Sequence, residues 1–159
     1  MHPSIPAWVP ALFLVLVFLG YRQSLPHTVK PARLVAIALA MFGLSLYGVL
    51  GAFGPEPPAL LAWAVGYGVA VSLGARHFIP GLVPVGNRVR IPGSWAPLAL
   101  VLGIFTAKFV LGFAAATHAP VLRLPGFAVG MSLALGALSG GFGARALAVH
   151  RCATSTSVA

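Results

Sequence analysis

Apolar residues run along the chain in five long stretches, separated by short segments rich in proline, glycine or charge. These stretches do not alternate apolar and polar residues, and each is longer than the roughly 10 residues of a membrane β-strand. A helix crosses a bilayer with about 20 mainly apolar residues. The pattern therefore makes strands unlikely and predicts an all-α, integral membrane five-helix bundle in one domain, with helices over residues 5–21, 34–53, 59–75, 95–117 and 127–149.

Composition supports lipid as the solvent of this chain. Hydrophobic residues make up 59% of it and charged residues 7%, whereas a soluble domain carries about 25% charged residues. The net charge of +9 alone would suggest a nucleic-acid binder, but the 10 Lys and Arg residues are spread over loops and helix ends rather than gathered in a basic stripe. We therefore expect the lipid bilayer, and no nucleic acid, as a partner.

The basic residues also predict an orientation. The first and third connections and the C-terminal end hold eight of the Lys and Arg residues, whereas the second and fourth connections hold only Arg123. Cytoplasmic loops of membrane proteins carry the Lys and Arg excess. We expect the N-terminus outside, the C-terminus in the cytoplasm, and a place in the inner membrane of a bacterium. Met1–Pro10 lacks the basic start of a cleaved signal peptide, and Glu56 should cap the outer, positive end of the third helix.

Small residues recur at four-residue spacing in the last three predicted helices. Such faces let helix backbones approach closely in lipid. Two interpretations stay open: packing of helices within one chain, and a homodimer face, for which the fifth helix is the best candidate. The residues concerned are Gly66, Ala70 and Gly74 in the third helix, Ala99, Gly103 and Ala107 in the fourth, and Gly136 and Gly140 in the fifth.

Lys108 lies deep within the fourth predicted helix, roughly 14 Å from its nearer end at 1.5 Å per residue. A charge at such depth costs about 2.5 to 3.5 kcal/mol on an insertion scale, and the only acidic side chain, Glu56, lies in a connection. One hypothesis is a polar layer that binds a ligand; the alternative is a structural lysine whose stem reaches toward the headgroups. The residues that match Lys108 in depth are Ser45, Tyr47 and Tyr67.

Few other residues suggest chemistry. The single cysteine, Cys152, cannot form an internal disulfide, and the predicted spans contain no carboxylate or histidine for a proton relay or a metal. We therefore expect no metal and no cofactor, and an enzyme is disfavoured. The histidines lie in loops or at helix ends without metal-ligand spacing: His2, His27, His77, His118 and His150.

Three segments carry a resemblance that covers most of the chain: residues 21–34, residues 45–48, and residues 92–98 with Lys108 downstream. Together they resemble a family of uncharacterised proteobacterial inner-membrane proteins, a domain of unknown function. The resemblance implies the same fold and compartment and brings no known activity or catalytic residues. The layout is more weakly similar to that of a five-helix protein associated with cytochrome c biogenesis, without a shared motif.

These observations lead to three hypotheses about function. The first is a non-catalytic multi-pass membrane protein that binds or helps to move a small or lipid-like molecule, or supports a membrane protein partner. The second is a membrane-embedded enzyme or redox-biogenesis accessory that uses Lys108. The third is a purely structural membrane subunit. A cavity that reaches Lys108 would favour the first, an accessible reactive amine the second, and a closed, dry bundle the third.

Overall fold

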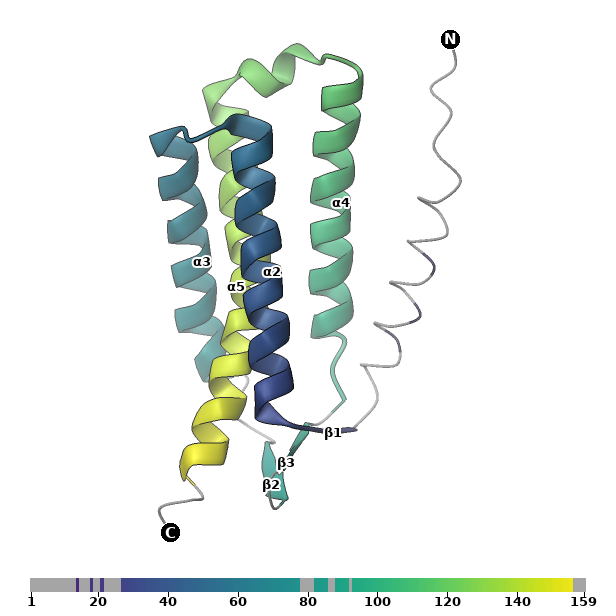
Figure 1. The fold of residues 1–159 in the computed structure, drawn as a ribbon, viewed down its shortest axis with the longest axis vertical. Helices are drawn as coiled ribbons and strands as arrows, with labels where there is room; N and C mark the ends of the chain where they lie inside the picture. The colour runs from purple at the N-terminus through teal and green to yellow at the C-terminus, as the bar shows by residue number, and fades with distance from the viewer. Residues whose placement is uncertain are drawn as a thin grey trace.

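Four long helices form the body of the part of the chain that the structure describes (Figure 1). The computed structural model describes residues 27–77, 82–85, 88–91 and 93–155, together with Leu14, Phe18 and Tyr21, which are helical. Apart from these three residues, the predicted first helix lies outside the described part of the chain. The long helices are α2 (Pro31–Phe53), α3 (Pro57–His77), α4 (Ala96–Ala116) and α5 (Pro125–Ser155).

All four helices are long and apolar enough to cross a membrane. Their length and composition indicate a multi-pass membrane protein. The described residues thus contain four candidate spans rather than the five expected from the sequence, because the fifth prediction, residues 5–21, falls almost wholly outside them.

Proline explains why three of these helices begin earlier than expected. The predictions began where the apolar runs begin, at residues 34, 59 and 127, but α2, α3 and α5 start at Pro31, Pro57 and Pro125. Proline suits a first turn because the N–H that it lacks would have no partner within the helix there. At the other end of α2, Gly54 takes a φ of 70° and its N–H donates to the carbonyl of Leu50 at 2.9 Å, an ending that favours glycine.

A small antiparallel sheet corrects the expectation of an all-α fold. It contains β1 (His27–Val29), β2 (Val83–Val85) and β3 (Arg88–Ile91) in the order β1-β3-β2. The sheet therefore joins the first predicted connection to the third. Strands of three or four residues are too short to be recognised from periodicity, although Arg88–Ile91 does alternate between exposed and buried positions.

Buried side chains hold this sheet against the helices. Val29, Val89 and Ile91 form an apolar cluster with Val149 of α5, and Leu34 of α2 packs against it. Within the third predicted connection, β2 and β3 thus form an antiparallel pair that is anchored to the bundle. β1 buries Val29, and β3 buries Val89 and Ile91. Because side chains alternate along a strand, Arg88 and Arg90 lie on the opposite face of β3.

Helix α5 is central to the bundle, because it packs against α2, α3 and α4 (Figure 1). The main core cluster lies between them and includes Val49, Trp63, Ala107, Leu111 and Leu135. The two ends of the bundle differ. One end carries the sheet and the C-terminal part of α5, and the other carries the α2–α3 turn and the short 3-10 helix η1 (Pro120–Arg123).

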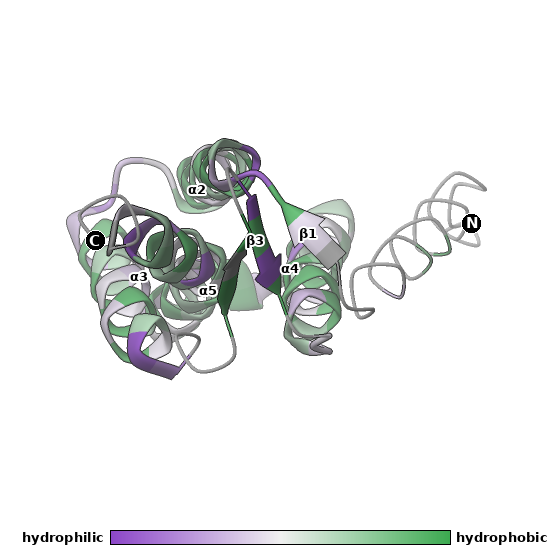
Figure 2. Cartoon of the chain, turned by 90° about the horizontal axis from the view of Figure 1, so that it is seen from below, coloured by the Kyte–Doolittle hydropathy of each residue, from purple (hydrophilic) through white to green (hydrophobic). Residues whose placement is uncertain are grey.

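Most basic residues lie at the end that carries the sheet. Figure 2 looks at the molecule from this end and shows hydrophilic residues on β3 and at the start of α2. The connections that the sequence predicted to share one side of the membrane therefore lie at one end of the molecule. Which side of a membrane this end faces stays a prediction.

Candidate functional site

A buried hydrogen-bond chain joins three helices at Ser45. Its hydroxyl donates to the carbonyl of Leu135 at 3.0 Å and accepts from the indole N–H of Trp63 at 2.9 Å. Ser45 is 1% exposed, so these two bonds satisfy polar groups that water does not reach. Ser45 thus fastens α2 to α3 and α5, which is a structural role.

Tyr67 shares Trp63 with this chain but packs as an aromatic residue. Its ring stacks on Trp63 with centroids 5.8 Å apart and meets Phe42 edge-on at 5.1 Å. The hydroxyl lies close to Gly143 of α5, where an added Cβ would come within 2.7 Å of it. The tyrosine therefore fills the space between α2, α3 and α5.

Lys108 contacts α2 rather than the other candidate side chains. Its amine donates to the carbonyl of Leu44 at 3.4 Å, and Gly48 leaves the space that the lysine occupies, because a Cβ there would collide with the amine. The lysine is half-buried. A backbone carbonyl thus supplies part of the compensation that a membrane lysine without an acidic partner needs.

The proposed polar layer is therefore divided. Ser45 and Tyr67 both contact Trp63, whereas Lys108 turns to Leu44 and Gly48. Tyr47 is 75% exposed and lies on the outside of the bundle. The reason lies in helix geometry, since residues two apart differ by about 200° around the axis at 3.6 residues per turn. Depth alone placed Ser45 and Tyr47 together, but they face opposite ways.

The small residues of α3 and α5 bring two backbones of the same chain together. A Cβ added at Gly136 would lie 3.0 Å from the backbone nitrogen of Tyr67, and one at Gly140 would lie 2.6 Å from its carbonyl oxygen. A Cβ at Gly66 would lie 3.1 Å from the nitrogen of Ala137. These three glycines face the partner helix within the chain, so a homodimer contact through the same face of α5 would have to displace α3.

The other small residues contribute less. A Cβ at Gly140 would also lie 2.8 Å from that of Ala70, which places Ala70 in the same contact. At Gly103 the added atom would meet the flexible end of Leu138 at 2.7 Å, a neighbour that can move. Gly74 is half-buried near the end of α3.

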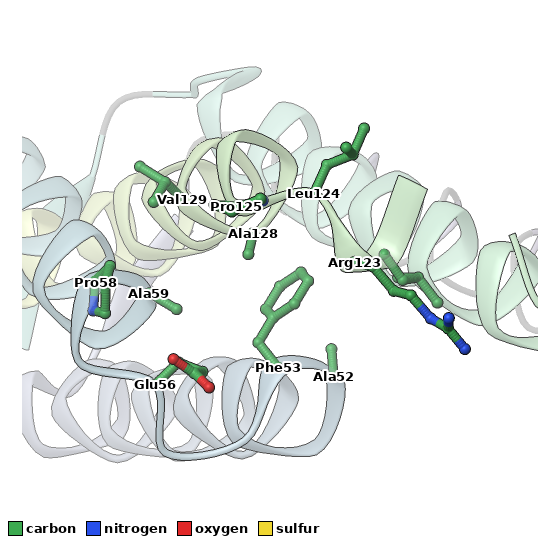
Figure 3. Close-up of a pocket in the computed structure, with 11 residues that line it drawn as sticks. Ala52, Phe53, Glu56, Pro58, Ala59, Arg123, Leu124, Pro125, Ala128 and Val129 are labelled. Atoms are coloured by element: carbon green, nitrogen blue, oxygen red, sulfur yellow. The ribbon is translucent and has the colours of Figure 1, made fainter. Parts of the chain in front are cut away.

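A cavity of about 360 Å³ lies at the end of the bundle opposite the sheet, between the α2–α3 turn and the start of α5. We call it the outer cavity, because it lies at the end of the bundle that the sequence predicts to face outward. Figure 3 shows Phe53 pointing across it toward Ala128, with Glu56 and Arg123 on opposite sides of Phe53. The lining is mostly apolar and consists of Ala52, Phe53, Glu56, Pro58, Ala59, Leu122, Arg123, Leu124, Pro125, Ala128 and Val129.

Sequence reasoning missed this cavity. Glu56 directly precedes α3, and its carbonyl accepts from the N–H of Leu60 at 3.1 Å, so it stands where a cap was predicted. Its side chain is exposed and also lines the cavity. The available signal was that two oppositely charged residues stand alone in the second and fourth connections, which the alternating helices bring to one end.

Metal-binding geometry is not found in the part of the chain that the structure describes, since no three His, Cys, Asp or Glu side chains gather there. No curated protein and no solved structure matches the chain. A family of unknown function, DUF6622, matches residues 2–159, and its span agrees with the resemblance noted in the sequence. With a match over nearly its whole length, the chain belongs to the family DUF6622.

Proposed function

We propose that this protein is a non-catalytic, multi-pass bacterial inner-membrane protein that binds an amphipathic small molecule in the outer cavity. The observation that carries the proposal is the lining of that cavity: a mostly apolar surface that includes one carboxylate, Glu56, and one guanidinium, Arg123. Ligand sites are typically concave and apolar, with a few polar groups that fix the orientation of the ligand.

The opposite charges favour a zwitterionic head group. The carboxylate of Glu56 can accept hydrogen bonds from an ammonium group, and the guanidinium of Arg123 can donate two parallel hydrogen bonds to a phosphate. Phe53, Ala128 and Val129 would contact the apolar part of the ligand. The cavity lies at the end of long apolar helices, the depth at which lipid head groups lie, so a phosphoethanolamine lipid has the right chemistry.

The contacts of Lys108 support a non-catalytic role. The amine donates to the backbone carbonyl of Leu44 beside Gly48, a contact that gives the lysine a structural role. The lysine does not line the outer cavity. We therefore propose Glu56 and Arg123 as the ligand contacts and Lys108 as a residue whose side chain packs α4 against α2 at Gly48.

The test is a titration of the purified protein, in an uncharged detergent, with short-chain phosphatidylethanolamine. Binding is measured as the increase in the temperature of thermal unfolding. Ala128→Leu should weaken binding by about tenfold or more, because the three added carbon atoms would occupy space that the ligand needs. Ala115→Leu is the matched control, since Ala115 is exposed, lies near the end of α4 and does not line the outer cavity. Glu56→Gln should weaken the binding of the zwitterionic lipid but not the binding of an anionic lipid.

If Ala128→Leu binds as tightly as the parent, the outer cavity is not the site. The absence of any zwitterion-dependent stabilisation in the parent would favour the purely structural subunit instead. Two observations support that alternative: the buried bonds of Ser45 and the close approach of α3 to α5 at Gly136.

A further inference from the structure

Three basic residues surround a second, smaller cavity at the end of the bundle that carries the sheet. This cavity of about 180 Å³ is lined by Thr28, Val29, Lys30, Arg33 and Arg88. The cations come from three places in the sequence: the end of β1, the first turn of α2, and β3. We call it the basic cavity. It is separate from the outer cavity and shares no residue with it.

The strand register brings two of these cations side by side. Val29 pairs with Val89 in the antiparallel ladder of β1 and β3, so the next residue of the first chain segment, Lys30, follows beside Arg88. Like charges in directly opposite positions destabilise a sheet. Arg33 of the adjoining helical turn lines the same cavity, so three cations share one site, and a bound anion would offset their mutual repulsion.

The start of α2 adds further positive character. Lys30 occupies the N-cap position, no side-chain hydrogen bond caps the helix, and its first turn contains no acidic residue. Pro31 has no N–H and the N–H of Arg33 donates to the carbonyl of Lys30 at 3.0 Å, so it is the dipole of the helix N-terminus that attracts an anion here. This helix has 23 residues, so its N-terminal turn presents the full partial charge.

The chain offers no acidic side chain to balance this charge. It contains one Asp or Glu in total, and that residue, Glu56, lies in the turn at the opposite end of α2. The counter-charge of the basic cavity must therefore come from another molecule. Arginine matches phosphate with two parallel hydrogen bonds, Lys30 adds a compact charge, and the hydroxyl of Thr28 can donate one bond more.

An apolar groove leads away from the same lysine. A third cavity, of about 670 Å³, runs along α2 and is lined by Lys30, Pro31, Ala32, Val35, Ala36 and Leu39, with His150 of α5 at its side. Positions 32, 35, 36 and 39 share one face of a helix. Leu39 is 66% exposed. Lys30 lines both cavities, so one ligand can place its phosphate in the first and an acyl chain along the second.

We propose that Lys30, Arg33 and Arg88 bind the phosphate of an anionic glycerophospholipid whose acyl chain lies along the groove at Val35, Ala36 and Leu39. A soluble phosphate shares the head-group chemistry but has no use for the groove. The face of the sheet that points away from the helices also suits contact with lipid, because it exposes Val83 and Val85, each 52% exposed.

The test uses the full chain in phosphatidylcholine nanodiscs, with phosphatidylglycerol as the anionic lipid and glycerol 3-phosphate as its soluble counterpart. Bound lipid is counted by native mass spectrometry, and thermal unfolding without the anionic lipid shows that each variant folds. Arg88→Gln should weaken phosphatidylglycerol binding by about tenfold or more, the usual size of a charged hydrogen bond. Arg88→Lys keeps the charge but loses the paired hydrogen bonds, so its affinity for phosphatidylglycerol should lie between those of the parent and of Arg88→Gln.

Two matched controls make the test specific. Arg76→Gln removes the same charge from the exposed end of α3, outside the basic cavity, and should leave binding unchanged. Ala36→Phe should block the groove, whereas Ala40→Phe, one turn further along the same helix and outside the groove, should not.

Two results would overturn the proposal. An equal loss of binding in Arg76→Gln and Arg88→Gln would mean that net charge alone attracts the lipid. Tight binding of phosphatidylglycerol by Ala36→Phe, together with equally tight binding of glycerol 3-phosphate, would make the basic cavity a soluble-phosphate site without a lipid chain. Both results are compared at a constant phosphatidylcholine background, with phosphatidylglycerol or glycerol 3-phosphate as the ligand, so the outer cavity is tested separately.

Discussion

Replacing Gly136 by alanine adds a single methyl group at the closest point between α3 and α5. The new carbon would lie 2.9 Å from the carbonyl carbon of Trp63 and 3.0 Å from the backbone nitrogen of Tyr67. Both are backbone atoms of a regular helix, so neither can rotate away as a side chain would. The two helices would have to move apart, and Gly66 and Gly140 would lose their close contacts as well.

Two opposing terms set the expected effect on stability. Alanine in place of glycine stabilises a helix interior by about 1 kcal/mol. Forcing an extra methyl group into a packed contact costs about 1 to 3 kcal/mol, and contacts with backbone on both sides belong at the upper end of that range. We therefore expect Gly136→Ala to lower the free energy of unfolding by about 2 kcal/mol, the difference of these two terms.

The assay is reversible unfolding in mixed micelles, followed by helical circular dichroism. Gly130→Ala is the matched control, because Gly130 lies on the same helix and a Cβ there would meet nothing within 4 Å. It should be unchanged or more stable by up to about 1 kcal/mol. Equal stability of Gly136→Ala and Gly130→Ala would refute the close α3–α5 contact.

Three further predictions concern single side chains and orientation. Ser45→Val should destabilise the protein by about 1 to 3 kcal/mol in the same assay, because it leaves a buried indole N–H without its acceptor; a wild-type unfolding curve would contradict this. Lys108→Met should be at least as stable as the parent, since it removes a membrane charge and keeps the apolar stem; a clear loss would mean that the amine makes an essential contact. In a Cys152→Ala background, an impermeant maleimide added to intact cells should label Pro55→Cys and not His77→Cys. Labelling of the latter alone would reverse the predicted orientation.

The long helices were predictable because a span needs only length and apolar composition, both of which are read directly from sequence. The first residues of the helices were harder to predict. The apolar runs begin after Pro31 and Pro57, which the helices include in their first turns. Depth within a span was also countable, and Lys108 contacts Leu44, the residue before Ser45. The predicted polar layer was based on depth and did not consider the direction in which each side chain points from the helix axis, and this direction separates Ser45 from Tyr47.

The sheet and the cavities could not be predicted in the same way. They depend on which connections meet once the helices alternate, and that is a property of the whole bundle. Arg88 lies far from Lys30 in sequence, and only the pairing of Val29 with Val89 brings them together. Glu56 and Arg123 likewise belong to different connections and share a cavity only through the packing of α2, α3 and α5.

Pairing of β1 with β3 has a consequence for the order of events during biosynthesis. β1 leaves the ribosome before α2, but its partner follows only after α3. The segment between them is one complete helical hairpin, which must enter the bilayer and return to the same side before the ladder can close. Once closed, the ladder ties the entry of that hairpin to its exit. The buried face of the sheet is covered only when Val149 of α5 is in place, so the last helix completes the link that the first strand begins.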